Sequence, residues 1–274
     1  MLVCTLGDLL LDVVVRLDRA LVHGADVPAR TRIAAGGQAA NVAAWVAALG
    51  GCARFIGTRA DDESGRLAAA ALVEQGVEIV GPCVREGSGV VVSLVAPDGD
   101  RTLASDRGVA VDLRADEIER AWLDCDHLHV SAYALAVEPV RNAAARAVSL
   151  AREHGAGVSV DLAASTVIES VGPSDFRTLL ARLAPDVVFC NEDEDDAIGG
   201  RVAGPTWVVK RGRRGASVDG VDYAASPVER VVDATGAGDA FAAGWIIGGV
   251  PLALEAAARC IAQVGAMPAL PKVT

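Results

Sequence analysis

The chain has 274 residues, of which 52% are hydrophobic and 22% charged, and its formal net charge at pH 7 is −11. This composition is typical of a folded globular protein with one large or two small domains. The acidic balance argues against nucleic acid and anionic membranes as partners, because phosphate contacts need surplus Lys and Arg.

The apolar first residues run directly into Gly7 and Asp8 without the basic segment of a signal peptide. No apolar run approaches the roughly 20 residues that cross a bilayer. The six cysteines lie far apart in the sequence and include no Cys-x-x-Cys pair. We therefore expect reduced cysteines, a cytoplasmic protein and no membrane partner.

Short β-branched runs alternate with Ala- and Leu-rich stretches along the chain, which predicts an α/β fold with a mostly parallel sheet wrapped by helices. The expected strands are residues 2–6, 54–57, 127–131, 157–161, 187–191 and 206–210. The expected helices are residues 38–49, 64–75, 137–154, 176–183, 238–247 and 252–264. Such folds place ligands at the carboxyl ends of the strands.

Two segments interrupt this alternation. Residues 9–15 form an extended run directly after the first strand, and residues 89–105 have the pattern of a hairpin around an Asp-Gly turn. We expect them to form a small antiparallel sheet that stands off the main body as a lid. The lid would comprise about residues 9–33 and 87–108 of a single domain over 1–274.

The clearest chemical motif is Gly236-Ala237-Gly238-Asp239, which precedes an Ala-rich helix. Small residues let the backbone turn tightly, and the amides of the helix's first turn can bind phosphate and stabilise a transferring phosphoryl group. Asp239 can take the proton from an attacking hydroxyl. On these four residues alone, an Asp that only caps the helix is an equal alternative.

Two longer matches separate these alternatives. Residues 233–244 resemble the C-terminal signature of the PfkB/ribokinase family of carbohydrate kinases, and Gly36-Gly37-Gln38-Ala39-Ala40-Asn41 through Gly50 resembles its N-terminal signature. The resemblance covers nearly the whole chain. It implies a ribokinase-like three-layer sandwich and an ATP-dependent kinase, with Asp239 as general base and Gly236, Ala237 and Gly238 as the anion hole.

The resemblance also implies an acceptor site, formed by Asp12, Gly36, Gly37 and Asn41. Asn41 offers both a donor and an acceptor for sugar hydroxyls, although a Gly turn that caps a helix and exposes Asn41 is the alternative. Asp8 is expected to be a turn residue. Arg101 matches an arginine that the lids of relatives carry near the substrate, and a solvent-exposed strand arginine is its alternative.

For the nucleotide, the resemblance implies contacts from Lys210, Gly212 and Gly215. Asn191 and Glu194 resemble the family's Asn-x-x-Glu motif, which positions Mg²⁺ through its water shell; a solvated acidic helix start is the alternative. Asp233 and Thr235 lie where some relatives hold a monovalent cation, so dependence on K⁺ is a further hypothesis.

Several points stay open in the sequence. Gln38 stands where ribokinases carry Lys, which puts ribose itself in doubt, and the acceptor could be a sugar with a primary hydroxyl, a sugar acid or a nucleoside. A catalytically silent sugar- or nucleotide-binding regulator is the alternative of another class, and the intact Asp239 argues against it. The lid strands predict a homodimer. A dinucleotide-binding dehydrogenase is disfavoured, because the first strand leads into Gly7-Asp8-Leu9 and not Gly-x-Gly-x-x-Gly.

Overall fold

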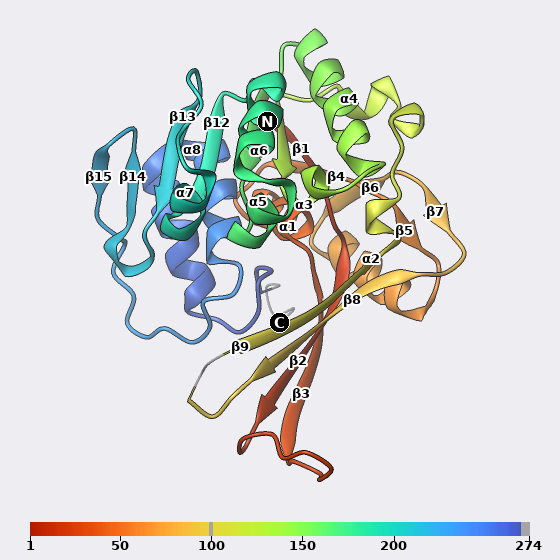
Figure 1. Ribbon diagram of the computed structural model, residues 1–274, viewed down its shortest axis with the longest axis vertical. Coiled ribbons are helices and arrows are strands. Elements are labelled where there is room, and N and C mark those ends of the chain that lie inside the picture. Colours follow the sequence, from red (N-terminus) through yellow and green to blue (C-terminus); the bar gives the residue numbers. More distant parts are fainter. Residues whose placement is uncertain (99–100, 270–274) are drawn as a thin grey trace.

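The computed structural model describes residues 1–98 and 101–269, except for the side chain of Arg101. A large sheet lies between two layers of helices, and a second sheet projects from this body toward the lower part of Figure 1. The alternation of strand and helix patterns predicted this layered arrangement.

The described residues place nine strands in the central sheet, in the order β15-β14-β13-β12-β11-β10-β1-β4-β6. The strands from β13 to β6 run parallel, and β14 and β15 are antiparallel additions at one edge. Their bounds are β1 Leu2–Leu6, β4 Cys52–Ile56, β6 Val77–Val80, β10 His127–Ser131, β11 Gly157–Asp161, β12 Val187–Asn191, β13 Thr206–Lys210, β14 Ala216–Val218 and β15 Val221–Tyr223. The six strands expected from the sequence are all present, and β6, β14 and β15 were not expected.

Two hydrophobic clusters, one on each face of the sheet, form the core, because successive side chains of a strand point to opposite faces. One cluster joins the sheet to α1 Gln38–Ala48, α2 Glu63–Glu74 and α8 Ala237–Ile261. The other joins it to α3 Tyr133–Ala136, α4 Val140–Glu153, α5 Ser165–Val171, α6 Pro173–Leu183 and α7 Glu192–Ile198. Short 3-10 helices occupy Val109–Val111, Ala115–Glu117, Arg120–Leu123 and Gly212–Arg214.

Helix α8 corrects one expectation, because it is 25 residues long and an 18-residue stretch within it has a mean hydropathy of 1.5, so by length and composition alone it could cross a membrane. Gly248 and Gly249 have non-helical backbone angles inside it, so it consists of two helices joined at a kink, as the sequence predicted. Its first part packs through Phe241 and neighbouring alanines into the core beside α1. These contacts are those of a core helix.

The second sheet has the order β3-β2-β8-β9 and comprises β2 Leu10–Leu17, β3 Ala29–Gly36, β8 Ser88–Val95 and β9 Arg101–Gly108. The expected hairpin is β8 and β9, although residues 99 and 100 of its turn lie outside the described part. The expectation of an antiparallel sheet was wrong at its centre, because β2 and β8 are parallel. A long connection through the main body joins β2 to β8, and a connection of this length allows the two strands to run parallel. A separate parallel pair joins β5 Arg59–Ala60 to β7 Cys83–Val84.

Asp62 ties the second sheet to the body. Its carboxylate caps α2 by accepting a hydrogen bond from the Gly65 amide at 2.8 Å. It also accepts hydrogen bonds from the amides of Gly87 and Ser88, both at 2.9 Å, and from the Ser88 hydroxyl at 2.6 Å. The bonds from Ser88 are the largest cause of a pKa for Asp62 well below its ordinary value.

We expect Asp62→Ala to lower the free energy of unfolding by about 2–3 kcal/mol, because it removes a helix cap and leaves two further amides without their acceptor. Since the pKa of Asp62 is depressed in the folded state, this contribution is present above the ordinary carboxyl pKa and is lost as pH falls below it. Urea denaturation at neutral pH measures it. The neighbouring exposed Asp61→Ala is the control and should change stability by less than about 0.5 kcal/mol.

Candidate active site

Charged side chains from two parallel strands meet at the carboxyl edge of the central sheet. Asp161 ends β11 and Lys210 ends β13, with β12 between them. The Lys210 ammonium donates a 2.6 Å hydrogen bond to Asp161 Oδ2, and Asp161 is 0% exposed. Burial disfavours the charged form of Lys210, but the carboxylates of Asp161 and Glu194 outweigh it and raise the pKa of Lys210. The site therefore contains a largely enclosed lysine whose charged form is favoured by its neighbours.

Asp239 lies in the first turn of α8 and faces the first signature. The Nδ2 of Asn41, on α1, donates a 2.8 Å hydrogen bond to Asp239 Oδ2. Burial raises the pKa of Asp239 to about 7, and the charges of Asp161 and Asp12 act in the same direction. The hydrogen bond from Asn41 and the charge of Lys210 oppose this rise. Asp239 is thus a carboxyl group that exchanges its proton near neutral pH.

Asn41 itself is buried and 6% exposed, so its expected exposed alternative is wrong. Within the described residues its Oδ1 has no hydrogen-bond partner. A buried acceptor without a partner is unfavourable and is commonly satisfied by a ligand or by water. Asn41 therefore donates to Asp239 through one end of its amide and carries a buried oxygen at the other end that can accept a hydrogen bond.

The Gly236-Ala237-Gly238 turn begins α8 as predicted. Gly236 has φ of 78°, and a Cβ there would stand 2.6 Å from Ala266, so a larger residue would not fit. The indole Nε1 of Trp45 on α1 holds the Ala266 carbonyl at 2.7 Å. At Gly238, a Cβ would stand 3.2 Å from the Lys210 ammonium nitrogen. The amides of the first turn of α8 and the Lys210 ammonium thus lie close together.

The residues predicted to hold the acceptor lie on the other side of this space. Gly37 has φ of 97° and approaches the Asp8 carbonyl so closely that a Cβ would stand 2.2 Å from its oxygen. The carboxylate of Asp12 lies over Gly36, within 2.2–2.5 Å of where a Cβ would stand. Because Asp12 raises the pKa of Asp239, the structure brings both carboxylates to one site.

Asp8 is a correction, since we expected a turn residue. It is 3% exposed, and Arg107 of β9 donates two hydrogen bonds to its carboxylate, at 2.6 and 2.8 Å. The Arg107 guanidinium also lies 5.7 Å from the ring centre of Tyr133. Arg101, the arginine expected near the substrate, has a side chain outside the described part, and its backbone pairs with Val95 at the far end of the second sheet. Arg107 is thus an arginine that reaches the body from the second sheet.

Asn191 and Glu194 form a capping box at the start of α7. The Asn191 amide and its Nδ2 each donate to the Glu194 carboxylate at 2.8 Å, and Glu194 N donates to Asn191 Oδ1 at 2.9 Å. Glu194 is 3% exposed, so it is not the solvated acidic residue of the alternative, and burial raises its pKa to about 7.

This arrangement limits how a metal could bind. Within the described residues there is no group of three or more His, Cys, Asp or Glu side chains that could hold an ion directly. The oxygens of Asn191 and Glu194 already accept hydrogen bonds from each other's segment. They fit Mg²⁺ through its bound waters, because Mg²⁺ keeps several waters and needs few protein ligands.

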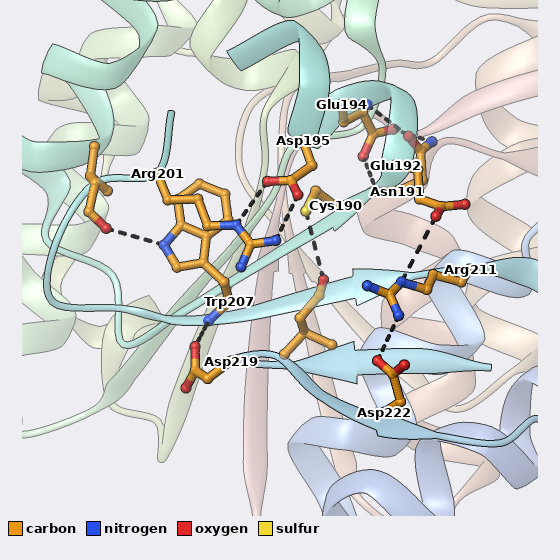
Figure 2. A network of polar contacts seen from close by, with 12 residues as sticks. Cys190, Asn191, Glu192, Glu194, Asp195, Arg201, Trp207, Arg211, Asp219 and Asp222 are labelled. Atoms are coloured by element: carbon orange, nitrogen blue, oxygen red, sulfur yellow. Dashed lines mark hydrogen bonds and ion pairs between the residues drawn. The ribbon is translucent and has the colours of Figure 1, made fainter. Parts of the chain in front are cut away.

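The predicted nucleotide loop follows β13. Arg211 N donates to the Gly215 carbonyl at 2.8 Å, and Gly215 N donates to the Gly212 carbonyl at 2.9 Å, which closes a tight loop. Figure 2 shows that carboxylates hold its arginine side chain, since Arg211 donates to Asp222 at 2.6 Å and faces Glu192. Arg214 also bonds Glu192. Lys210 faces Asp161 and the Gly238 turn and not this loop.

Asp233 and Thr235 hydrogen-bond each other just before the Gly236-Ala237-Gly238 turn. Asp233 Oδ1 accepts hydrogen bonds from the Thr235 amide at 3.0 Å and its hydroxyl at 2.7 Å, and Asp233 Oδ2 accepts one from the Gly265 amide at 3.2 Å. This network is a local turn that also brings the 264–266 segment against Gly236.

The sequence reasoning missed Asp161 and Arg107. Asp161 had an available signal, because it is a carboxylate at the carboxyl end of a predicted buried strand. Arg107 had none, since its partner Asp8 lies 99 residues away in the sequence. His127 and His129 of β10 both bond the Ser159 hydroxyl, and His129 is fully buried.

Comparisons with known proteins agree with the two signatures. A family model described as pfkB family carbohydrate kinase matches residues 2–267. The chain is 34% identical to an ATP-dependent ribose-1-phosphate kinase of Halopiger xanaduensis, over 91% of this chain and 86% of the relative. It is also 34% identical to fructokinase-1 of Oryza sativa, over 88% and 80%. The crystal structure of adenosine kinase from Sinorhizobium meliloti matches with a TM-score of 0.86 and 25% identity, over 98% and 96%.

We expect Asp239→Asn to raise the free energy of unfolding at pH 8 by about 1–2 kcal/mol, because it removes a partly buried negative charge. Solvent screening at this half-buried site keeps the gain small. The folded-state pKa of about 7 lies above the ordinary 3.8, so the stabilising contribution of the wild-type carboxyl is full below 3.8 and is lost as pH rises through 7. The gain should therefore vanish near pH 4. Thermal unfolding at both pH values measures it, with the exposed Asp116→Asn as control. An equal gain at both pH values would contradict the burial of charge at Asp239.

Proposed function

Because the chain belongs to the PfkB family of carbohydrate kinases and has the ribokinase fold, we propose that it transfers the γ-phosphoryl group of ATP to a primary hydroxyl of a sugar or sugar-like molecule. The observation that carries this proposal is Asp239, a carboxyl group with a pKa of about 7 at the amino end of a helix. A general base works best when its pKa lies near the operating pH.

In this mechanism Asp12, Gly36, Gly37 and Asn41 bind and orient the acceptor. Asp12 and the unpartnered Oδ1 of Asn41 accept hydrogen bonds from its hydroxyls. Asp239 takes the proton from the attacking hydroxyl, and the hydrogen bond from Asn41 keeps its carboxylate oriented. The amides of Gly236, Ala237 and Gly238 stabilise the charge on the transferring phosphoryl group.

The nucleotide would lie along the loop of Gly212 and Gly215 with its phosphates toward Lys210 and the α8 turn. Mg²⁺, when bound, neutralises phosphate charge, and Asn191 and Glu194 would hold its water shell. We extend the proposal to a monovalent cation such as K⁺ beside Asp233 and Thr235, whose oxygens border the turn. We also propose a cytoplasmic location, with neither nucleic acid nor membrane as partner.

A nucleoside is the second candidate for the acceptor. It is supported by the likeness to the adenosine kinase structure, whereas the sequence relatives act, by their names, on ribose-1-phosphate or fructose. Both candidates use the same base and the same phosphoryl site. A catalytically silent regulator would not require a base tuned to neutral pH, so the pKa of Asp239 argues against that class.

We expect the wild-type protein to phosphorylate at least one member of a panel of ketoses, aldoses, sugar phosphates, sugar acids and nucleosides with ATP and Mg²⁺. Asp239→Asn should lower turnover by about 10²–10⁴-fold while ATP binding persists. Since the base must be ionised, kcat/KM should rise with pH through about 7. Coupled ADP release measures both. Near-normal turnover of Asp239→Asn would remove the assigned base, and inactivity of the wild type on the whole panel would remove the function.

The four-stranded sheet is proposed as the lid of the acceptor site and as the contact between two copies of the chain. Asp12 of β2 and Gly36 of β3 connect it to the site. Ile33 on β3 is 59% exposed and Leu103 on β9 is 54% exposed, and exposed apolar side chains on a sheet favour association.

We expect light scattering to give twice the 28.0 kDa mass of one chain. Ile33→Glu should shift the mass toward one chain, because a charge in an apolar contact is unfavourable. Val73 on α2, which is 58% exposed and outside the lid, provides the control variant Val73→Glu. A wild-type mass of 28.0 kDa would remove the dimer and leave the lid proposal intact.

A further inference from the structure

The contacts of Lys210 distinguish it from the other cations near the proposed nucleotide site. Arg211 follows it directly in the sequence and Arg214 lies in the same loop, but Asp222 and Glu192 bind the guanidinium groups of these two arginines. Lys210 instead extends inward across β12 to Asp161. Its ammonium nitrogen lies 3.2 Å from the position of a Cβ on Gly238.

Asp161 fixes the direction of this ammonium. Its Oδ2 accepts the hydrogen bond from Lys210 at 2.6 Å, and its Oδ1 accepts one from the Ala163 amide at 3.1 Å. Both oxygens of a fully buried carboxylate are thus held by the protein. An ammonium has three donors, and the bond to Asp161 uses one of them. The lysine side chain is held at one point and keeps donors for a further acceptor.

We propose that Lys210 is a catalytic residue that donates a hydrogen bond to the transferring phosphoryl group, and that Asp161 is the positioning residue that directs it. This inference rests on the kinase function proposed above. It changes the role expected for Lys210 from a contact with the nucleotide in general to a contact with the transferring phosphoryl group.

The chemical step is balanced without proton transfer from Lys210. The acceptor oxygen forms a bond to the γ-phosphorus while its proton passes to Asp239. The bond from that phosphorus to the β–γ bridging oxygen breaks, and ADP leaves with the electron pair. The ammonium stays protonated and stabilises the negative charge on the phosphoryl oxygens, which is a contact that strengthens in the transition state.

The charges that face the site make this cation important. Asp161 from β11 and Asp12 from β2 disfavour the ionised form of Asp239, and Lys210 from β13 favours it. Glu194 from α7 and Asp239 from α8 both act on Lys210 in turn. Loss of Lys210 therefore leaves several carboxylates facing a polyphosphate, whose charge they repel.

We expect Lys210→Met to lower kcat by about 10²–10³-fold, the loss that follows removal of one charge-stabilising donor. Lys210→Arg should recover part of it. In calorimetry, the dissociation constant of Lys210→Met for ADP alone should lie within about threefold of the wild-type value. Aluminium fluoride and the acceptor mimic the transferring group, and the extra affinity for ADP that they confer should be at least about tenfold smaller in the variant. Equal loss of both affinities would indicate a merely structural role and overturn the proposal.

The pH profile supplies a second readout. Lys210→Met should move the acidic limb of kcat/KM to higher pH, whereas Asp161→Asn should move it to lower pH, since the two charges act oppositely on Asp239. Shifts in the same direction would contradict the proposal. Lys210→Met leaves the buried charge of Asp161 unpaired, which can prevent folding. The double variant Lys210→Met/Asp161→Asn replaces the ion pair with two neutral side chains. It should show the same loss of the affinity gained with aluminium fluoride.

Arg152→Met is the matched control, because Arg152 forms a 2.7 Å ion pair with Asp186 near the start of β12, at the opposite edge of the sheet. It should leave kcat and both affinities unchanged. If the wild type phosphorylates an acceptor and Lys210→Met does so at a normal rate, this inference fails while the kinase function stands. If the wild type phosphorylates none, both fail.

Discussion

The buried carboxylate of Asp161 requires a positive partner, and the arrangement of the site depends on that requirement. An unpaired charge in the interior is strongly unfavourable, whereas a paired and hydrogen-bonded one is tolerated. Lys210 satisfies it from two strands away, and the Ala163 amide holds the remaining oxygen. The pair therefore holds a cation beneath the Gly238 turn in a chain whose net charge is −11.

The same pair acts on the proton affinity of Asp239. Burial and the nearby carboxylates raise the pKa of Asp239, and Lys210 and Asn41 limit that rise, so the value lies near 7. In the proposed mechanism, this arrangement supplies a base for the acceptor and a cation for the phosphoryl group. Burial likewise raises the pKa of Glu194 to about 7, with Asp161 acting in the same direction and Lys210 against it.

The second sheet, β3-β2-β8-β9, is attached to the body at separate points around this site. Asp62 joins the start of β8 to α2, and Arg107 of β9 binds Asp8 at the end of β1. On the other side, Arg32 of β3 donates a 2.8 Å hydrogen bond to the Val264 carbonyl, next to the segment that packs against Gly236. The second sheet therefore contacts the body both beside Asp8 and beside the segment that packs against Gly236.

The sequence alone determined the features that depend on local backbone preferences: the alternating strands and helices, the Gly-Ala-Gly turn before Asp239, and the glycines ahead of Asn41. It predicted the hairpin of β8 and β9 but not the parallel pairing of β2 with β8. It also missed α7, because an acidic run has the composition of a solvated segment until a capping box buries Glu194. Only the tertiary structure decided the pairs Asp161–Lys210 and Asp8–Arg107, which are 49 and 99 residues apart, because strand order brings such partners together and leaves no periodic pattern in the chain.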